Sequence, residues 1–262
     1  MSAGFLSMRQ MLVAVFMLAT CEPKMARAEA LGSGLVFLDE IDATIIQDMR
    51  YAGKNNFVGR PLPGYGSAQC VVKSRVANAL KQVQSELIAK KLSLNMLDCY
   101  RPIRAVQAMV QWVSDSKISG DKSYFPRTKK AALINQGYIA SRSGHSTGTV
   151  VDLTLVDLSV SPDGANALSE NGPQNNYRAP NEIDMGTNYD CFDPKSTTFN
   201  TEISQQQQQN RAMLVALMNR HGFSNYKREW WHFSFRGASS VAFDFDIPVG
   251  RNYRKEPANG LD

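Results

Sequence analysis

The sequence predicts an α+β fold in which a small, mainly antiparallel sheet is flanked by helices. Amphipathic segments with helical spacing alternate irregularly with short β-branched or aromatic runs, without the strand–helix–strand rhythm of a parallel sheet. Hydrophobic residues make up 43% of the 262 residues, enough for a globular core. We expect one domain over residues 29–262, with a functional site on one face of its sheet.

Three helices and a strand are predicted in the first half of this domain. Residues 70–91 form an amphipathic helix, with apolar residues at helical spacing: Val72, Val76, Ala79, Leu80, Val83 and Leu87. Leu94–Cys99 then forms a short buried strand. Pro102 suits the first turn of a second helix, whose apolar stripe consists of Val106, Met109, Val110 and Val113. Thr128–Gln136 is predicted as a weaker helix.

Two strands and a helix are predicted in the second half. Thr149–Leu155 is a β-branched run, and Trp231–Phe235 alternates between apolar and polar residues. Residues 157–190 are rich in Pro, Gly, Asn and Asp, and a loop of this length inside a domain is often functional. Five glutamines at 205–209 form the polar start of a helix that ends near Gly222, because glycine suits the position after a helix.

The first 28 residues have the pattern of a secretory signal. Arg9 supplies a positive charge, the apolar run at residues 11–20 is too short to span a bilayer, and the Ala-Arg-Ala at 26–28 suits cleavage. The Leu-Ala-Thr-Cys that ends at Cys21 also resembles a lipobox, which would anchor the mature protein by its lipidated cysteine. An apolar first helix of the domain is a third possibility. We expect an exported protein of the periplasm or cell envelope.

Charge and cysteine content narrow the classes of function. Cleavage after residue 28 removes three basic residues and one acidic residue, which lowers the net charge from +5 to +3. This charge is too mild to indicate nucleic-acid binding, which usually uses a concentrated basic stripe. No further apolar run approaches membrane-spanning length. Cys70, Cys99 and Cys191 remain; an exported protein can oxidise one pair of them, and the sequence does not select which.

Two short segments contain two of the three histidines, each with a carboxylate nearby. The first holds His145 and, seven residues later, Asp152; the second holds Glu229 and, three residues later, His232. Two imidazoles and one carboxylate make a catalytic zinc site with an open position, and the second carboxylate is then free to act as a base. Asp152 is flanked by apolar residues, where an unpaired carboxylate is costly to bury, so a nearby cation is expected.

Each of these residues also has a purely structural interpretation. His145 can be a turn histidine, Asp152 a paired core carboxylate, and His232 a core histidine with Glu229 on the surface. The two segments together favour zinc. On the last strand His232 lies opposite the aromatic face, and a bend near Trp230 must return Glu229 to the histidine side.

Three other features received competing interpretations. Residues 144–148 match the G-x-S-x-G elbow of serine hydrolases, but that elbow needs a strand before it and a helix after it, whereas here the β-branched run follows. His221 lies at a predicted helix end, where a cation suits the dipole, and is interpreted as structural. Arg101 follows a predicted strand, where it can either stabilise an oxyanion or form a surface salt bridge.

Together these segments resemble the zinc-dependent D-alanyl-D-alanine dipeptidases, relatives of the peptidoglycan D,D-carboxypeptidases, lysostaphin-type peptidases and the hedgehog N-domain. The S-x-H-x-x-G-x-x-x-D pattern of that wider group corresponds to Ser143–Asp152, and its E-x-W-H pattern to Glu229–His232. Both patterns are complete here.

Three further segments resemble the dipeptidase branch in particular. They are DMRYA with NNFVG within residues 48–59, DCYRP at residues 98–102, and DMGTNYD at residues 184–190. Two positions depart from the usual pattern, with Cys99 where glycine is common and Tyr189 where phenylalanine is common. The resemblance spans nearly the whole mature chain.

The resemblance implies a role for each matched position. One zinc ion would be held by three ligands: His145, Asp152 and His232. Glu229 would be the general base and then the acid, and Arg101 would stabilise the tetrahedral intermediate. Three residues would shape the pocket for the substrate and its charged ends: Tyr51, Ser143 and Asp190.

The implied reaction is the hydrolysis of the dipeptide D-Ala-D-Ala to two molecules of D-Ala. One alternative is a D,D- or L,D-carboxypeptidase that trims peptidoglycan stem peptides by the same chemistry. Another is a zinc-bearing binding module without turnover. The expected partner is therefore a small D,D-dipeptide or a stem peptide, and not a nucleic acid.

Overall fold

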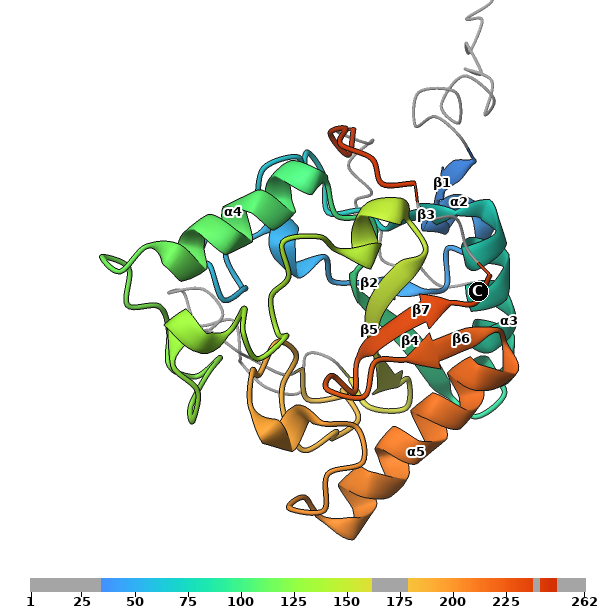
Figure 1. Ribbon diagram of the computed structural model, residues 1–262. Helices are drawn as coiled ribbons and strands as arrows, with labels where there is room; N and C mark the ends of the chain where they lie inside the picture. The colour runs from blue at the N-terminus through green and yellow to red at the C-terminus, as the bar shows by residue number, and fades with distance from the viewer. Residues whose placement is uncertain (1–33, 162–178, 238–240, 249–262) are drawn as a thin grey trace, which may run out of the picture.

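A five-stranded sheet in the order β2-β4-β5-β7-β6 forms the centre of the computed structural model (Figure 1). Its strands, in chain order, are β2 (Ile46–Gln47), β4 (Leu92–Asp98), β5 (Val150–Asp157), β6 (Phe223–Asn225) and β7 (His232–Phe235). The β2–β4 pair is parallel, and the other three pairs of this sheet are antiparallel. The predicted α+β class with a mainly antiparallel sheet is confirmed.

The structure describes residues 34–161, 179–237 and 241–248. The predicted signal and Cys21 therefore lie outside the described residues, as does the centre of the predicted 157–190 loop. In the parts that are described, no helix is both long enough and apolar enough to cross a membrane.

Three longer helices accompany the sheet: α3 (Ser74–Ile88), α4 (Ile103–Ser114) and α5 (Gln205–Arg220), with a short α2 (Leu38–Ile41) near the start. The glutamine run does begin α5, where Ser204 and Gln207 form a capping box that satisfies two backbone N–H groups at the helix start. Gly222 follows the end of α5 with a φ of +90°, the left-handed conformation that ends many helices.

The predicted helix over residues 70–91 starts too early. Its first residues form strand β3 (Val71–Lys73), which pairs antiparallel with β1 (Leu35–Phe37) in a separate two-stranded sheet. The helix begins only at Ser74. Consecutive valines at the start of β3 favour a strand, and because both are buried they also fit the apolar stripe of a helix.

The predicted helix at Thr128–Gln136 was wrong. This segment forms a single 3-10 turn at Lys130–Ala132. The segment is tied to the preceding loop by hydrogen bonds of a single side chain. The Lys130 ammonium donates to the carbonyls of Asp115 and Ile118. Only Leu133 of this segment is a fully buried apolar residue. The segment therefore has no apolar stripe whose burial could stabilise a helix.

The cysteine pairing that the sequence leaves open is Cys70–Cys99, with a Cα–Cα distance of 5.2 Å. Cys70 immediately precedes β3 and Cys99 immediately follows β4, so the bond ties the two-stranded sheet to the end of a central strand. Cys191 is a buried free thiol.

Candidate metal centre

Three carboxylate and imidazole side chains lie in one row across the sheet. Asp98 of β4 is paired with Asp152 of β5, and Asp152 is paired with His232 of β7. Residues that are directly opposite each other on neighbouring strands point to the same face. The strand register therefore brings together residues that are up to 134 positions apart in the chain.

His145 reaches this row from a short 3-10 helix, η3 (Gly144–Thr147), that precedes β5. The Ser143 hydroxyl caps the helix by accepting a hydrogen bond from the His145 backbone N–H at 3.2 Å. Gly148 ends η3 with a φ of +70°, and a Cβ there would come within 2.4 Å of Leu35. Glycine, which has no Cβ and readily adopts the left-handed backbone conformation, thus lets the chain turn sharply into β5. His145 can then fold back over Asp152.

The ligand atoms of His145, Asp152 and His232 all lie within 4.8 Å of one another. Asp152 Oδ1 is 3.0 Å from His232 Nδ1 and 3.3 Å from His145 Nε2, and the two nitrogens are 3.3 Å apart. Asp152 Oδ1 is buried without a well-formed hydrogen bond. Two converging imidazoles beside an unsatisfied carboxylate oxygen are the donor set of a catalytic zinc site, so these residues fit a metal ion.

The protonation of His145 is set by its second nitrogen. Nδ1 lies 2.8 Å from the carbonyl oxygen of Cys99, which can only accept, so Nδ1 carries the hydrogen. Nε2 is then left with its lone pair directed at Asp152 and His232. This arrangement is the usual one for a metal-binding histidine, whose outer nitrogen donates to a carbonyl or a carboxylate.

Burial and neighbours act on the protonation of the other two residues. Burial lowers the pKa of His232, which favours the neutral imidazole that can bind a metal. Burial alone would raise the pKa of Asp152, but the nitrogens of His145 and His232 hold it well below its ordinary range. The cluster thus presents one ionised carboxylate and the ring nitrogens of two imidazoles.

Arg101 is a buried cation beside the cluster, and not part of a surface salt bridge. Its side chain is 12% exposed and is bound to Asp98 through Nε at 2.9 Å and Nη2 at 2.8 Å. The same Nη2 is 3.6 Å from Asp152 Oδ2. Asp98 also accepts from the Tyr65 hydroxyl at 2.6 Å. The guanidinium is therefore held rigidly beside the three candidate ligands, His145, Asp152 and His232.

Two residues that the sequence analysis did not assign to the site belong to it. Asp98 anchors Arg101, and Tyr189 donates from its hydroxyl to Asp152 Oδ2 at 3.0 Å. Both lie in segments that carry the family resemblance: Tyr189 directly precedes Asp190, and Asp98 lies three positions before Arg101. Their buried contacts depend on strand register and loop path, which neighbouring positions in the sequence do not reveal.

Glu229 lies in the turn just before β7. Its backbone N–H donates to the Tyr226 carbonyl at 3.0 Å and its carbonyl accepts from His232 at 3.3 Å, so the bend expected near Trp230 is present. Glu229 Oε2 is 3.5 Å from His232 Nδ1. Burial, followed by the negative charges of Asp152 and Asp190, raises the pKa of Glu229 well above its ordinary value. This carboxylate is thus poised beside the cluster to exchange a proton.

A cavity of about 220 Å³ lies over the cluster, and all eight residues selected from the sequence line it: Tyr51, Arg101, Ser143, His145, Asp152, Asp190, Glu229 and His232. Asp190 accepts from the Tyr51 hydroxyl at 2.8 Å. Burial and repulsion from Asp152 raise the pKa of Asp190 to about 8. A cationic group of a ligand in this cavity would favour its ionised form.

The third histidine is placed elsewhere. His221 caps the end of α5 and its Nε2 is 2.7 Å from Glu86 Oε1 on α3. It takes no part in the cavity lining, which agrees with its interpretation as a structural residue.

Comparison with known proteins identifies the family. A peptidase M15 family model described as D-ala-D-ala dipeptidase matches residues 32–163 and 177–249. A D-alanyl-D-alanine dipeptidase of Enterococcus faecium is 32% identical over 217 residues, 82% of this chain and 98% of its own length. One of Enterococcus faecalis is 34% identical over 202 residues, 77% of this chain and 91% of its own.

Among solved structures, the vancomycin resistance D,D-pentapeptidase VanY in complex with Zn(II) is 17% identical, with a TM-score of 0.36. The match covers 65% of this chain and 76% of that one. The family model's two matched stretches include every residue of the candidate metal site and of the cavity lining. The chain belongs to the D-ala-D-ala dipeptidase family of M15 peptidases.

Proposed function

We propose that this protein is a zinc-dependent dipeptidase that hydrolyses D-Ala-D-Ala to two molecules of D-Ala. The observation that carries the proposal is the convergence of two imidazoles and a buried carboxylate oxygen on the floor of a small cavity, with a second carboxylate beside them. Membership of the family supports the substrate.

His145, Asp152 and His232 would hold one zinc ion. When bound, zinc supplies a Lewis acid that polarises the peptide carbonyl and makes water acidic enough to be deprotonated near pH 7. The three ligands leave the cavity side open for water and substrate, which is what distinguishes a catalytic site from a closed structural one.

Glu229 moves the proton. Its carboxylate accepts a proton from the attacking water as the water oxygen bonds to the carbonyl carbon, and it later returns that proton to the leaving nitrogen as the C–N bond breaks. A base with a raised pKa holds a proton more readily than an ordinary glutamate, so it suits both halves of this transfer. The raised pKa of Glu229 follows from its burial beside two other carboxylates.

Arg101 stabilises the charge that develops on the carbonyl oxygen. Its guanidinium is fixed by Asp98, so little reorganisation is needed when that charge appears. The ring of Tyr51 lies 4.9 Å beneath the guanidinium carbon and supports it from the other side.

Asp190, Tyr51 and Ser143 receive the ends of the dipeptide. The Asp190 carboxylate, held by the Tyr51 hydroxyl, is the group in the cavity suited to the substrate's ammonium. The volume of about 220 Å³ suits a small ligand better than a long peptide. The family model and the two enterococcal relatives, all named for D-Ala-D-Ala dipeptidase activity, favour the dipeptide over a stem peptide.

Export to the periplasm or cell envelope is also part of the proposal. The buried Cys70–Cys99 disulfide supports it, because structural disulfides persist in oxidising compartments and are rare in the cytosol. A reporter enzyme fused after residue 30 should be found outside the cytoplasm. A reporter that stays cytoplasmic would contradict export but would leave the proposed hydrolytic reaction unaffected.

The test of the substrate is a comparison of D-Ala release from the free dipeptide and from a stem pentapeptide that ends in D-Ala-D-Ala. We expect faster release from the dipeptide, measured as kcat/KM for each. Preference for the pentapeptide would replace the proposal with a D,D-carboxypeptidase. Zinc binding without release from either would indicate a binding module.

A further inference from the structure

We propose that the Cys70–Cys99 disulfide is a positioning element of the metal centre: it holds the carbonyl that orients His145, and its loss weakens zinc binding. This inference rests on the proposed function, because it takes His145 to be a zinc ligand. It assigns to the bond an effect on the site beyond the stability of the fold.

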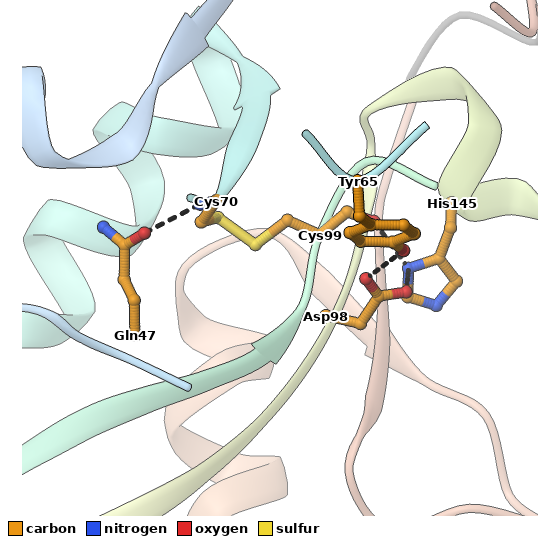
Figure 2. Close-up of a disulfide and its surroundings, with 6 residues drawn as sticks. All are labelled: Gln47, Tyr65, Cys70, Asp98, Cys99 and His145. Atoms are coloured by element: carbon orange, nitrogen blue, oxygen red, sulfur yellow. Dashed lines mark hydrogen bonds and ion pairs between the residues drawn. A yellow bond between two sulfur atoms is a disulfide. The ribbon is translucent and has the colours of Figure 1, made fainter. Parts of the chain in front are cut away.

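The contact with the site is made by Cys99. Its carbonyl oxygen accepts the hydrogen bond from His145 Nδ1 at 2.8 Å, so the position of this one oxygen sets both the tautomer and the tilt of the imidazole (Figure 2). A second, backbone hydrogen bond joins the same two segments: the Arg101 N–H donates to the His145 carbonyl at 3.3 Å. The residues that follow β4 thus hold His145 by its ring and by its main chain.

Cys70 is the fixed end of the disulfide. Its backbone N–H donates to Gln47 Oε1 at 2.7 Å (Figure 2). Its carbonyl accepts from the Leu38 N–H at 2.9 Å. Both cysteines are buried, at 0% and 1% exposure. Cys70 is therefore held by two elements that take no part in the metal cluster, and the disulfide carries that constraint to Cys99.

Cys99 needs such a constraint because it lies where the sheet ends. The register of β4 against β5 shifts between Met96 and Asp98, and Asp98 is the last residue of β4 that is paired with β5. Beyond it, the Tyr100 N–H bonds to the Val71 carbonyl of β3 at 2.9 Å. The Cys99 carbonyl is thus placed by contacts with β3 and by the disulfide, and no longer by the central ladder.

Asp98 makes the effect of a shift larger. The same His145 Nδ1 is 3.4 Å from Asp98 Oδ2, the oxygen that binds Arg101. If Cys99 moves, the imidazole can turn toward the carboxylate, and Nε2 then leaves its place beside Asp152. Changes to such outer partners of a metal-binding histidine typically weaken metal affinity by about 10–100-fold.

The test compares zinc affinity, by competition with a chelator, in the parent and in a Cys70→Ala/Cys99→Ala variant. The variant keeps the Cys99 carbonyl and every ligand, and it offers no new thiol to the metal. We expect zinc affinity to fall roughly 10–100-fold and the visible spectrum of the Co(II) form to change. Cys191→Ala, which removes a buried thiol and leaves the disulfide intact, should retain parental affinity and spectrum.

A second control separates positioning from stability. Leu217→Ala removes buried apolar volume in α5, outside the cavity lining, and lowers the melting temperature without touching residues 99–101. If Leu217→Ala weakens zinc as much as the cysteine variant does at equal melting temperature, the disulfide acts through stability alone and the inference is wrong. It is also wrong if the cysteine variant binds zinc within twofold of Cys191→Ala.

The reduced parent gives a readout if the double variant does not fold. A water-soluble phosphine reduces the bond to two thiols and is itself oxidised to its phosphine oxide, taking oxygen from water. We expect zinc to leave before the far-UV circular dichroism changes; release only together with unfolding overturns the inference. A parent that binds zinc and releases D-Ala regardless of the disulfide refutes this inference alone, whereas a parent that binds no zinc refutes the proposed function as well.

Discussion

Asp152 and His232 face each other across β5 and β7, with Asp152 Oδ1 3.0 Å from His232 Nδ1. The two residues are 80 positions apart, and a shift of one residue in the strand register would turn one of them to the opposite face. Asp98 extends the same row on β4. The register of three antiparallel strands thus decides whether the metal cluster exists, and η3 then adds His145.

Replacement of His145 by alanine should abolish stoichiometric zinc binding together with activity. Removal of one of three ligands leaves two, too few for a stable catalytic site. The matched control is His221→Ala, because His221 is bound to Glu86 outside the cavity and should retain both properties. Metal analysis of the two purified variants checks this. Full zinc content in His145→Ala would remove that residue from the ligand set.

Replacement of Glu229 by alanine should retain zinc and lower kcat by about 10²–10⁴-fold, the usual contribution of a positioned general base. Glu229 is 3.5 Å from His232 but is not needed to complete the ligand set. An exposed glutamate supplies the control: Glu202→Ala should leave kcat unchanged. Near-normal turnover in the Glu229 variant, at full zinc occupancy, is incompatible with the assigned role.

The pH profile should depend on Asp190. Activity requires Glu229 to be ionised, so it is lost as pH falls through the pKa of Glu229, which burial and neighbouring carboxylates raise and a bound zinc ion would lower. When the substrate's ammonium is bound and favours the ionised form of Asp190, the negative charge of Asp190 contributes to that increase. Asp190→Asn removes the repulsion and should move the acid limb of kcat to lower pH, with a higher KM because the ammonium partner is lost. An unmoved limb would show that another group controls it.

Replacement of Asp98 by asparagine should destabilise the fold strongly. The change removes the negative charge that pairs with the Arg101 guanidinium at two short contacts, and breaking a buried ion pair costs about 3–5 kcal/mol. The free energy of unfolding from urea titration checks this. Asp115→Asn, at a helix end away from the cavity, is the comparison and should change that free energy little; equal values for the two variants would mean that Arg101 finds another partner.

The sequence predicted the chemistry better than the architecture that supports it. All eight residues predicted for the site line one cavity. They could be predicted because a metal site requires particular residue types and because the family resemblance assigns the remaining positions. The central strands were found from their β-branched or apolar composition. Helix α5 was found because Met213, Leu214, Leu217 and Met218 follow the glutamine run and Gly222 marks its end.

What the sequence did not predict depends on contacts made between distant segments. Strands β1 and β3 are three residues each, too short for a periodic pattern, and they are defined by pairing with each other. The choice of Cys99 as the partner of Cys70 depends on where β4 ends. Tyr189 reaches the site from a loop whose path no local sequence pattern indicates. The segment around Lys130, predicted as a helix, is instead held by hydrogen bonds from the Lys130 ammonium to two backbone carbonyls.

The most direct test of the central claim follows zinc content and D-Ala-D-Ala hydrolysis in the same sample during metal removal and replacement. Zinc held by the His145, Asp152 and His232 cluster should amount to one ion per chain. Activity should disappear when a chelator removes that ion and should return in proportion as one equivalent of zinc is restored. Hydrolysis that continues in the metal-free protein would contradict the account.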